Sequence, residues 1–296
     1  MSAEPSVSAL TPGHFVSGPR GAPVPLVLAS PHSGRAWPPG FLSAAALDVG
    51  GLRRAEDAYV DELLAPATES GVPLITARWA RTYVDLNRDP QEIDLTLLSD
   101  PAAAGPVKTT ERVRSGLGVL PRLTGPGLHI YRNRISSAAA LQRIAAVHAP
   151  YHRRLAALID DAAACHGYAL LIDGHSMPPL SLPARQRPEI VIGDAGGTSA
   201  PESVVRRVEA HFRRAGLRVA RNTPYAGGYT TRFHAAPARS RFAIQIEIDR
   251  TLYMDPDTLE RHAGFGAIAE TLKNLVDELL DWLPQMFGRP PAIAAE

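Results

Sequence analysis

The feature that most constrains this chain is an apolar run at residues 168–173 that ends abruptly in polar residues. The run reads Tyr-Ala-Leu-Leu-Ile-Asp, and Gly174, His175 and Ser176 follow it directly. A short apolar run bounded by glycine predicts a strand buried on both faces, as in the sheet of an α/β protein. Functional groups in such proteins gather where strands end, so His175 is a candidate site residue.

Two other stretches have the same form. Residues 24–30 are an apolar run that leads into His32, and residues 242–248 are a run that carries Glu247 and precedes Asp249. The carboxyl ends of parallel strands lie at the same edge of a sheet. We therefore expect the ends of these three predicted strands to meet around one metal ion.

The rest of the chain alternates predicted strands with predicted helices. Further strands are expected at 73–77, 189–193 and 218–221, and helices at 53–66, 134–164 (kinked at Pro150), 201–215 and 256–283. This alternation predicts an α/β fold of three α/β/α layers with a central mixed, mostly parallel sheet. Residues 91–130 are rich in proline and glycine and predict a long excursion over the surface, a type of loop that is often functional.

Composition and charge exclude several classes of function. The 296 residues carry 31 basic and 30 acidic side chains, so no single-sign field attracts nucleic acid or a membrane. We expect one domain over residues 1–296, with a core at about 20–284 and loose termini. No signal peptide or membrane-spanning run is visible, which favours a cytoplasmic protein. The single cysteine, Cys165, fits a reducing compartment and is expected to be buried in a helix.

Two of the ten histidines, His32 and His175, stand apart because each follows an apolar run. Two neutral imidazoles and a carboxylate, with one position left for water, form a typical catalytic zinc set. Glu56 and Asp57, expected in the first turn of a helix, are both candidates for the carboxylate, although helix starts favour acidic residues anyway. Asp173 either orients a ligand histidine or satisfies nearby backbone N–H groups.

A metal-dependent hydrolase also needs a base that takes a proton from water and passes it to the leaving nitrogen. Glu247 and Asp249 point to the same face of their strand, and Glu247 lies deeper in the apolar run, so Glu247 is the predicted base. Asp249 is expected to pair with an arginine. Arginine also suits the capture of a substrate carboxylate. The candidate substrate-binding residues are Arg81, Asn87, Arg88 and Arg232.

Six short segments, taken in order, resemble the N-formylglutamate amidohydrolase family. They are Ser-Pro-His-Ser-Gly at 30–34, Asp-Ala-Tyr-Val-Asp-Glu-Leu at 57–63, Val-Asp-Leu-Asn-Arg-Asp-Pro at 84–90, Ile-Asp-Gly-His-Ser-Met at 172–177, Asn-Thr-Pro-Tyr-Ala-Gly-Gly-Tyr at 222–229 and Gln-Ile-Glu-Ile-Asp-Arg at 245–250. Each segment is weak alone, but six in one order over about residues 24–254 make a specific match.

The resemblance implies a phosphorylase/hydrolase-like amidohydrolase domain, related to zinc carboxypeptidases and aspartoacylases. It implies that metal-activated water cleaves N-formyl-L-glutamate, or a related N-acyl amino acid, to formate and L-glutamate, the last step of one histidine degradation route. By position, His32, Asp57 and His175 become ligands of Zn²⁺ and Glu247 the base. The chain departs from the carboxypeptidase pattern at Arg35, where those enzymes have a glutamate three residues after the first histidine.

Two alternatives remain open from the residues. Gly174, Ser176 and Pro178 nearly match the Gly-x-Ser-x-Gly nucleophile elbow of α/β serine hydrolases, with proline in place of the last glycine. A metal-free binding module is the second alternative. The expected partner is a small-molecule N-acyl amino acid, and the sequence does not set the oligomeric state.

Overall fold

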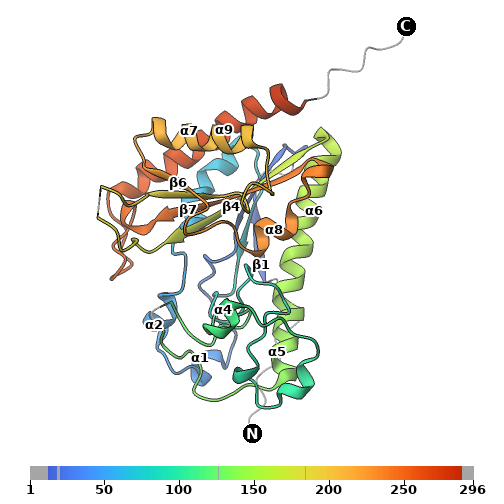
Figure 1. The fold of residues 1–296 in the computed structure, drawn as a ribbon, viewed down its shortest axis with the longest axis vertical. Coiled ribbons are helices and arrows are strands. Elements are labelled where there is room, and N and C mark those ends of the chain that lie inside the picture. Colours follow the sequence, from blue (N-terminus) through green and yellow to red (C-terminus); the bar gives the residue numbers. More distant parts are fainter. Residues whose placement is uncertain (1–12, 19–20, 126, 184, 289–296) are drawn as a thin grey trace. The chain divides into compact units, whose positions relative to one another are not determined.

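The computed structural model describes residues 13–18, 21–125, 127–183 and 185–288. Its central element is a seven-stranded sheet with the strand order β1-β3-β2-β4-β7-β5-β6 (Figure 1). A mixed sheet with flanking helices confirms the predicted α/β class. The predicted loose termini fall mainly on residues 1–12 and 289–296, which lie outside the described residues.

All of these strands except β1 form where the sequence predicted a strand. The strands are β1 (His14–Ser17), β2 (Leu26–Ser30), β3 (Leu74–Ala77), β4 (Ala169–Met177), β5 (Ile190–Gly193), β6 (Val219–Arg221) and β7 (Arg241–Asp249). Strand β4 pairs in parallel with both β2 and β7, whereas β5 pairs antiparallel with β7 and parallel with β6. All residues of β2, β4 and β5 are buried, as their composition predicts.

Two strand predictions need correction. Strand β4 does not end at Asp173 but continues to Met177, because β7 pairs with it as far as Asp249. His175 therefore lies in the last part of the strand rather than in a loop after it. Strand β1 lies in the stretch that we expected to be a loose lead-in. Three of its four residues are exposed, so no buried apolar run marked it in the sequence.

The helices are α1 (Phe41–Ala44), α2 (Val49–Arg53), α3 (Val60–Leu64), α4 (Glu111–Arg114), α5 (Ser137–Arg143), α6 (Ala149–His166), α7 (Glu202–Arg214), α8 (Tyr229–His234) and α9 (Gly264–Phe287). Between α5 and α6 the chain forms a π-helical turn at Ile144–His148, directly before Pro150. Proline lacks the N–H that continues an α-helical ladder, so the change of helix type agrees with the predicted kink.

The helix predicted at 53–66 is interrupted. Helix α3 begins only at Val60, because Tyr59 has a φ of 64°, in the left-handed region that an α-helix does not contain. Glu56 and Asp57 consequently lie in the loop before α3, and not in a first helical turn. Both acidic residues of this loop are buried: Glu56 is 3% exposed and Asp57 is 1% exposed.

Two predictions for the longer helices were also wrong in detail. Helix α9 begins at Gly264 rather than near residue 256, and it continues through Pro284. The left-handed φ of 60° at Leu259 is incompatible with the earlier start. Cys165 is exposed rather than buried, because it faces solvent on α6 while Ala162 on the same helix is buried.

The described residues group into two compact units. The first contains Met1–Phe15, Pro31–Ala58 and Thr76–Arg154, and the second contains Val16–Ser30, Tyr59–Ile75 and Leu155–Glu296. The prediction of one domain over residues 1–296 stays a prediction.

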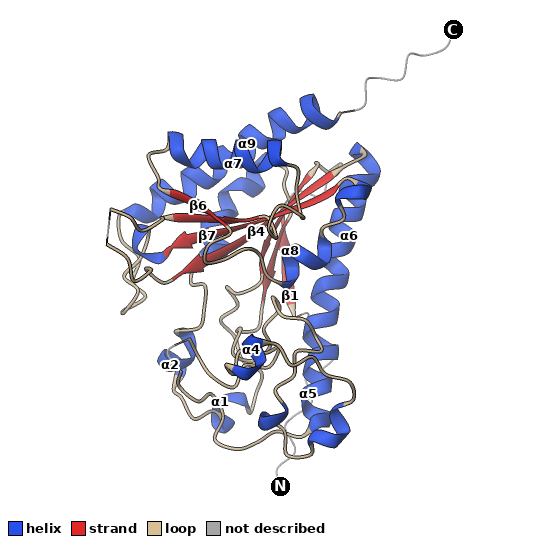
Figure 2. Cartoon of the chain, in the orientation of Figure 1, coloured by secondary structure: helices blue, strands red, loops and turns tan. Residues whose placement is uncertain are grey.

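The first unit consists largely of loops and short helices, including the excursion predicted at 91–130 (Figure 2). Its core contains a buried arginine, Arg143, which is 2% exposed. The guanidinium lies 4.7 Å from the ring centre of Tyr83 and 5.6 Å from that of Phe41, and it donates a hydrogen bond to the hydroxyl of Tyr131. Aromatic faces and a phenol oxygen thus stabilise a charge that would otherwise be costly to bury.

The second unit is layered. Helices α7 and α9 run together along one side of the sheet (Figure 1), and the Phe287 ring of α9 lies 5.2 Å from the Phe242 ring of β7. Helix α3 packs on this face so closely that a Cβ on Gly174 would lie 2.7 Å from Leu64. Because side chains alternate along a strand, the odd-numbered residues of β4 face the opposite side, where α8 contacts Asp173 through Thr231.

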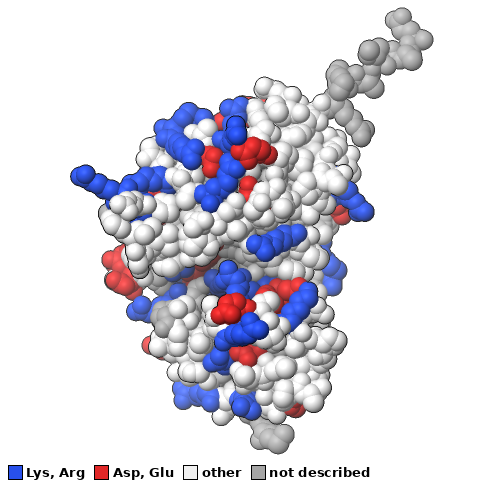
Figure 3. All heavy atoms as spheres, viewed as in Figure 1, with Lys and Arg blue, Asp and Glu red and all other residues white. Residues whose placement is uncertain are grey.

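The surface carries both signs of charge. Figure 3 shows acidic and basic side chains interspersed over the face in view, in keeping with a net charge of +1. Among the described helices, none combines the length and apolarity that crossing a bilayer requires.

Candidate metal centre

His32 lies in the loop after β2, and its ring is held between two carboxylates. Nε2 lies 2.7 Å from Oδ1 of Asp85, and Nδ1 lies 3.2 Å from Oδ2 of Asp57. The backbone N–H of Asp57 donates to the carbonyl of His32, which fixes the two residues side by side. If the shorter contact holds the single proton of a neutral imidazole, the Nδ1 lone pair faces a carboxylate oxygen. The Nδ1 atom of His32 and the Oδ2 atom of Asp57 are then two acceptors close together, and a cation can bind to both.

Asp85 belongs to the site, although sequence analysis did not select it. Its carboxylate also accepts hydrogen bonds from the backbone N–H of Asn87 and from Nε of Arg81, both at 2.9 Å. Burial raises the pKa of Asp85, but the charges of Arg81 and Arg88 and the hydrogen bond with His32 outweigh burial and hold this pKa well below its usual range. Asp85 is therefore ionised and can accept the ring N–H of His32.

The candidate substrate-binding residues differ in their surroundings. Arg88 is 5% exposed and donates to the backbone carbonyls of Leu117 and Asn87. Burial lowers the pKa of Arg88 to about 10, against the opposing effect of Asp85. Arg81 is less buried, with 24% of its side chain exposed, and Arg232 is exposed on α8.

His175 also has a carboxylate at its ring. Nε2 lies 3.2 Å from Oδ2 of Asp173, and the hydroxyl of Thr231 donates to the same oxygen at 3.3 Å. Asp173 thus contacts the histidine ring, which is the orienting arrangement that the sequence left undecided. Strands β2 and β4 pair with Ala29 opposite Asp173, so the end of β2, which leads to His32, lies beside this part of β4.

Glu247 and His175 are Cα partners on the paired parallel strands β7 and β4, so their side chains share one face of the sheet. The carboxylate of Glu247 accepts a hydrogen bond from Nε2 of Gln245 at 2.8 Å. Asp249 lies on the same face but is fully buried, and its carboxylate lies 3.0 Å from Nε of Arg187. An arginine partner for Asp249 agrees with the prediction.

Three of the predicted site residues come together. His32, Asp57 and His175 are buried, and each offers one ligand atom, with all three atoms within 4.8 Å of one another. Glu56 is engaged elsewhere, because it accepts a hydrogen bond from Arg53 at 2.9 Å and lies 3.7 Å from Arg35. Two imidazoles and a carboxylate fit a divalent ion such as zinc.

Ser176 does not have the surroundings of a serine nucleophile. It lies inside β4, whereas a nucleophile elbow is a sharp turn between a strand and a helix. Its hydroxyl accepts a hydrogen bond from Nε of Arg250 at 3.1 Å. The geometry therefore does not favour the serine-hydrolase alternative.

Comparisons with known proteins identify the family of the chain. The sequence model of the N-formylglutamate amidohydrolase family matches residues 24–254. The chain is similar to an N-formylglutamate deformylase of Pseudomonas aeruginosa, with 29% identity over 88% of this chain and 92% of that protein. A Pseudomonas putida protein of the same name is 26% identical over 90% of this chain and 96% of its own length.

The fold is similar to that of a solved relative as well. The crystal structure of an N-formylglutamate amidohydrolase from Ralstonia eutropha superposes with a TM-score of 0.87 and 31% identity, covering 93% of this chain and all of that one. The family match, the named relatives and the shared fold indicate a hydrolase that acts on an amide bond. The chain belongs to the N-formylglutamate amidohydrolase family.

Proposed function

We propose that this protein hydrolyses N-formyl-L-glutamate, or a closely related N-acyl amino acid, and releases formate and L-glutamate with the help of a divalent metal ion, most simply Zn²⁺. The substrate is inferred from what the relatives are named for. The observation that carries the metal is the approach of the His32, Asp57 and His175 ligand atoms to within 4.8 Å of one another. A role in histidine degradation stays a prediction.

His32, Asp57 and His175 would hold the ion. Asp85 accepts from one ring nitrogen of His32 at 2.7 Å, and Asp173 contacts a ring nitrogen of His175 at 3.2 Å. Such carboxylates fix the tautomer and the orientation of a histidine ligand. A bound zinc ion would supply Lewis acidity toward the amide carbonyl and would lower the pKa of water.

Glu247 is the group proposed to move the proton. It shares a face of the sheet with His175 and is 7% exposed, and Gln245 donates a hydrogen bond to one of its oxygens. In amide hydrolysis a base takes the proton of the attacking water and delivers it to the leaving nitrogen. A carboxylate beside a proposed metal ligand is suited to both transfers.

Arginines are proposed to bind the carboxylates of the glutamate moiety. Arg81 keeps 24% of its side chain exposed while one of its N–H groups holds Asp85, so it can connect substrate binding with the orientation of His32. Arg88 remains charged at neutral pH because its pKa, although lowered by burial, is about 10. The exposed Arg232 is the least constrained of the proposed contacts.

The test is a substrate screen combined with metal analysis. We expect the purified protein to contain about one zinc per chain, to lose activity with a chelator and to regain it when zinc returns. We expect formate release from N-formyl-L-glutamate to exceed amine release from N-acetyl-L-glutamate. Full activity after complete metal removal would rule out the proposed metal. A zinc-loaded protein that hydrolyses another N-acyl amino acid but not N-formyl-L-glutamate would rule out the proposed substrate.

A further inference from the structure

The side chain of Gln245 connects the proposed base, Glu247, to the glycine-rich loop of residues 222–228. Gln245 is 3% exposed and lies on β7, two residues before Glu247, so both side chains point to the same face. Its Nε2 donates to Oε1 of Glu247 at 2.8 Å, and its Oε1 accepts the backbone N–H of Gly228 at 2.8 Å. One amide thus makes one bond to the loop and one bond to the base.

The backbone N–H of Gly228 determines which way the Gln245 amide points. A backbone N–H can only donate, so the amide oxygen must face Gly228. The NH₂ group then has to face Glu247, and it is a donor matched to a carboxylate acceptor. Rotation of the amide would place two donors together at Gly228 and two acceptors together at Glu247, so only one orientation is stable.

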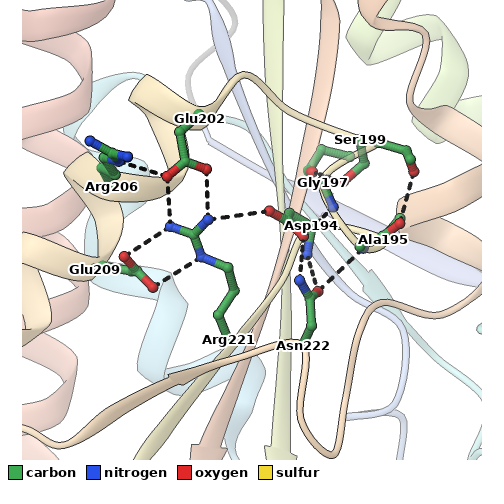
Figure 4. A network of polar contacts seen from close by, with 12 residues as sticks. Asp194, Ala195, Gly197, Ser199, Glu202, Arg206, Glu209, Arg221 and Asn222 are labelled. Carbon is green, nitrogen blue, oxygen red and sulfur yellow. Dashed lines mark hydrogen bonds and ion pairs between the residues drawn. The ribbon is translucent and has the colours of Figure 1, made fainter.

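The loop that supplies this N–H is itself held in place. Asn222 exchanges hydrogen bonds with Asp194, through Nδ2 at 2.7 Å and through the Asp194 backbone N–H at 3.1 Å (Figure 4). The backbone N–H of Ala195 donates to the carbonyl of Ala226 at 2.7 Å. The loop is therefore fixed at its start and in its middle before it reaches Gly228.

An ion-pair network supports the start of the loop. Arg221, directly before Asn222, donates to Glu202 at 2.6 Å and to Glu209 at 2.9 Å, so that β6 is tied to α7 (Figure 4). Hydrogen bonds from Arg221 and Arg206 lower the pKa of Glu202 to about 2, which keeps this acid charged. A loop held by these contacts can serve as a fixed reference for a side chain that bonds to it.

We propose that Gln245 is a positioning residue that fixes the carboxylate of Glu247 in the orientation that proton transfer needs. The inference rests on the proposed function, in which Glu247 is the base. Proton transfer requires the carboxylate within hydrogen-bond reach of water and leaving nitrogen, and a carboxylate on a rotatable stem meets this condition only part of the time. The hydrogen bond from Gln245 restricts the rotation of the Glu247 side chain.

Two substitutions separate the two bonds of the amide. Gln245→Glu keeps an acceptor for Gly228 N–H and, when ionised, replaces the donor toward Glu247 with a second carboxylate, whereas Gln245→Leu removes both bonds. For both variants at pH 8 we expect kcat to fall about tenfold to hundredfold, with KM and zinc content unchanged, because a charge-assisted hydrogen bond is lost. Hydrogen exchange in residues 222–228 should accelerate in Gln245→Leu and stay as in the wild type in Gln245→Glu.

A double-mutant cycle then tests whether Gln245 acts through Glu247. In a Glu247→Gln background, adding Gln245→Leu should cause little further loss, because the group being positioned is already absent. If the two losses multiply instead, Gln245 does not act through Glu247 and the inference is overturned. Wild-type kcat in Gln245→Leu would overturn it as well, since Glu247 would then work without either bond of the amide.

The cycle also separates this inference from the proposed function. Nearly full activity in Glu247→Gln would mean that Glu247 is not the base, which overturns both the assignment of the base and the role of Gln245. An impaired Glu247→Gln beside a fully active Gln245→Leu would overturn the role of Gln245 alone. Gln142→Leu and Gln142→Glu, at an exposed glutamine of α5, are matched controls and should keep wild-type kinetics.

Discussion

At the scale of single residues, His32 shows how carboxylates can prepare an imidazole to bind a cation. Asp85 lies 2.7 Å from one ring nitrogen, and Arg81 and Arg88 hold the pKa of Asp85 well below its usual range despite burial. An ionised Asp85 fixes the proton on the nitrogen that it contacts. The other nitrogen then presents its lone pair toward Asp57.

The first prediction follows from this arrangement. In Asp85→Asn, the side-chain NH₂ can donate to Nε2 of His32, which moves the ring proton to the nitrogen needed for the metal. We expect the Kd for zinc to rise about tenfold to hundredfold, measured by competition with a chromogenic chelator. Asp94→Asn is the matched control, because Asp94 is also buried but pairs with Arg122, and it should keep the wild-type Kd. Equal Kd values in all three proteins would contradict the orienting role of Asp85.

A second prediction concerns the proposed metal ligand on β4. We expect His175→Ala to lose both bound zinc and activity, whereas Glu247→Gln should keep its zinc and lose roughly two or more orders of magnitude in kcat. Plasma emission measurement of zinc beside the formate assay distinguishes the two outcomes. A Glu247→Gln protein without zinc would indicate that Glu247 is a ligand rather than the base.

The sequence allowed some residues of the site to be predicted and not others. His32 and His175 follow apolar runs, and these runs form the strands β2 and β4 that were predicted from them. Asp85 and Gln245 had no such pattern, because their importance comes from partners far along the chain or across a loop. Residue type alone could not separate them from ordinary buried polar residues.

At the scale of elements, strands were easier to predict than helix boundaries. Strands β2, β4, β5 and β7 are buried on both faces, so their composition is apolar over several successive residues. Helix ends depend on backbone conformations that composition does not encode, such as the left-handed φ of Tyr59 before α3. Helix α8 was missed because its six residues follow a glycine-rich loop and are too short for a clear periodicity.

The third prediction tests how closely the glycine-rich loop packs on β5. A Cβ on Gly193 would lie 2.7 Å from backbone atoms of Ala226 and Gly227, which cannot move aside as a flexible side chain can. We expect Gly193→Ala to destabilise the protein by about 1–3 kcal/mol and to lower kcat, because the loop that anchors Gln245 must shift. Urea unfolding and formate release are the measurements.

Gly266→Ala is the control for that substitution. Gly266 is exposed in α9, and a Cβ there would have no atom within 4 Å. Alanine is the better helix former, so this variant should be more stable by about 0.5–1 kcal/mol with unchanged activity. If both variants were equally stable, close packing of Gly193 against the loop would not be the reason for the glycine.

At the scale of the whole molecule, burial of polar and charged groups links stability to pH. His148 and His152 are 2% and 5% exposed, and their Nε2 atoms lie 2.9 Å and 2.8 Å from the carbonyls of Arg88 and Leu86. Since a carbonyl only accepts, both rings must donate from Nε2. The two histidines therefore support the backbone on either side of Asn87, in the segment that carries Asp85, and they do so without needing a charge.

The last prediction is a loss of stability in mild acid that depends on His148. Burial lowers the pKa of His148 below 6.5, although the nearby Arg88 carbonyl, Asp85 and Asp89 oppose the shift. The unfolded chain therefore binds a proton at a pH where the folded protein does not, so the stability present above about pH 6.5 is lost as the pH falls toward the folded-state pKa. His148→Gln keeps an N–H donor but cannot titrate, so its urea midpoint should fall less between pH 7.5 and 5.5 than that of the wild type.

A chelator in every sample prevents metal release from contributing, and His129→Gln, at an exposed histidine, should follow the wild type. Identical pH dependence in wild type and His148→Gln would show that another group causes the loss.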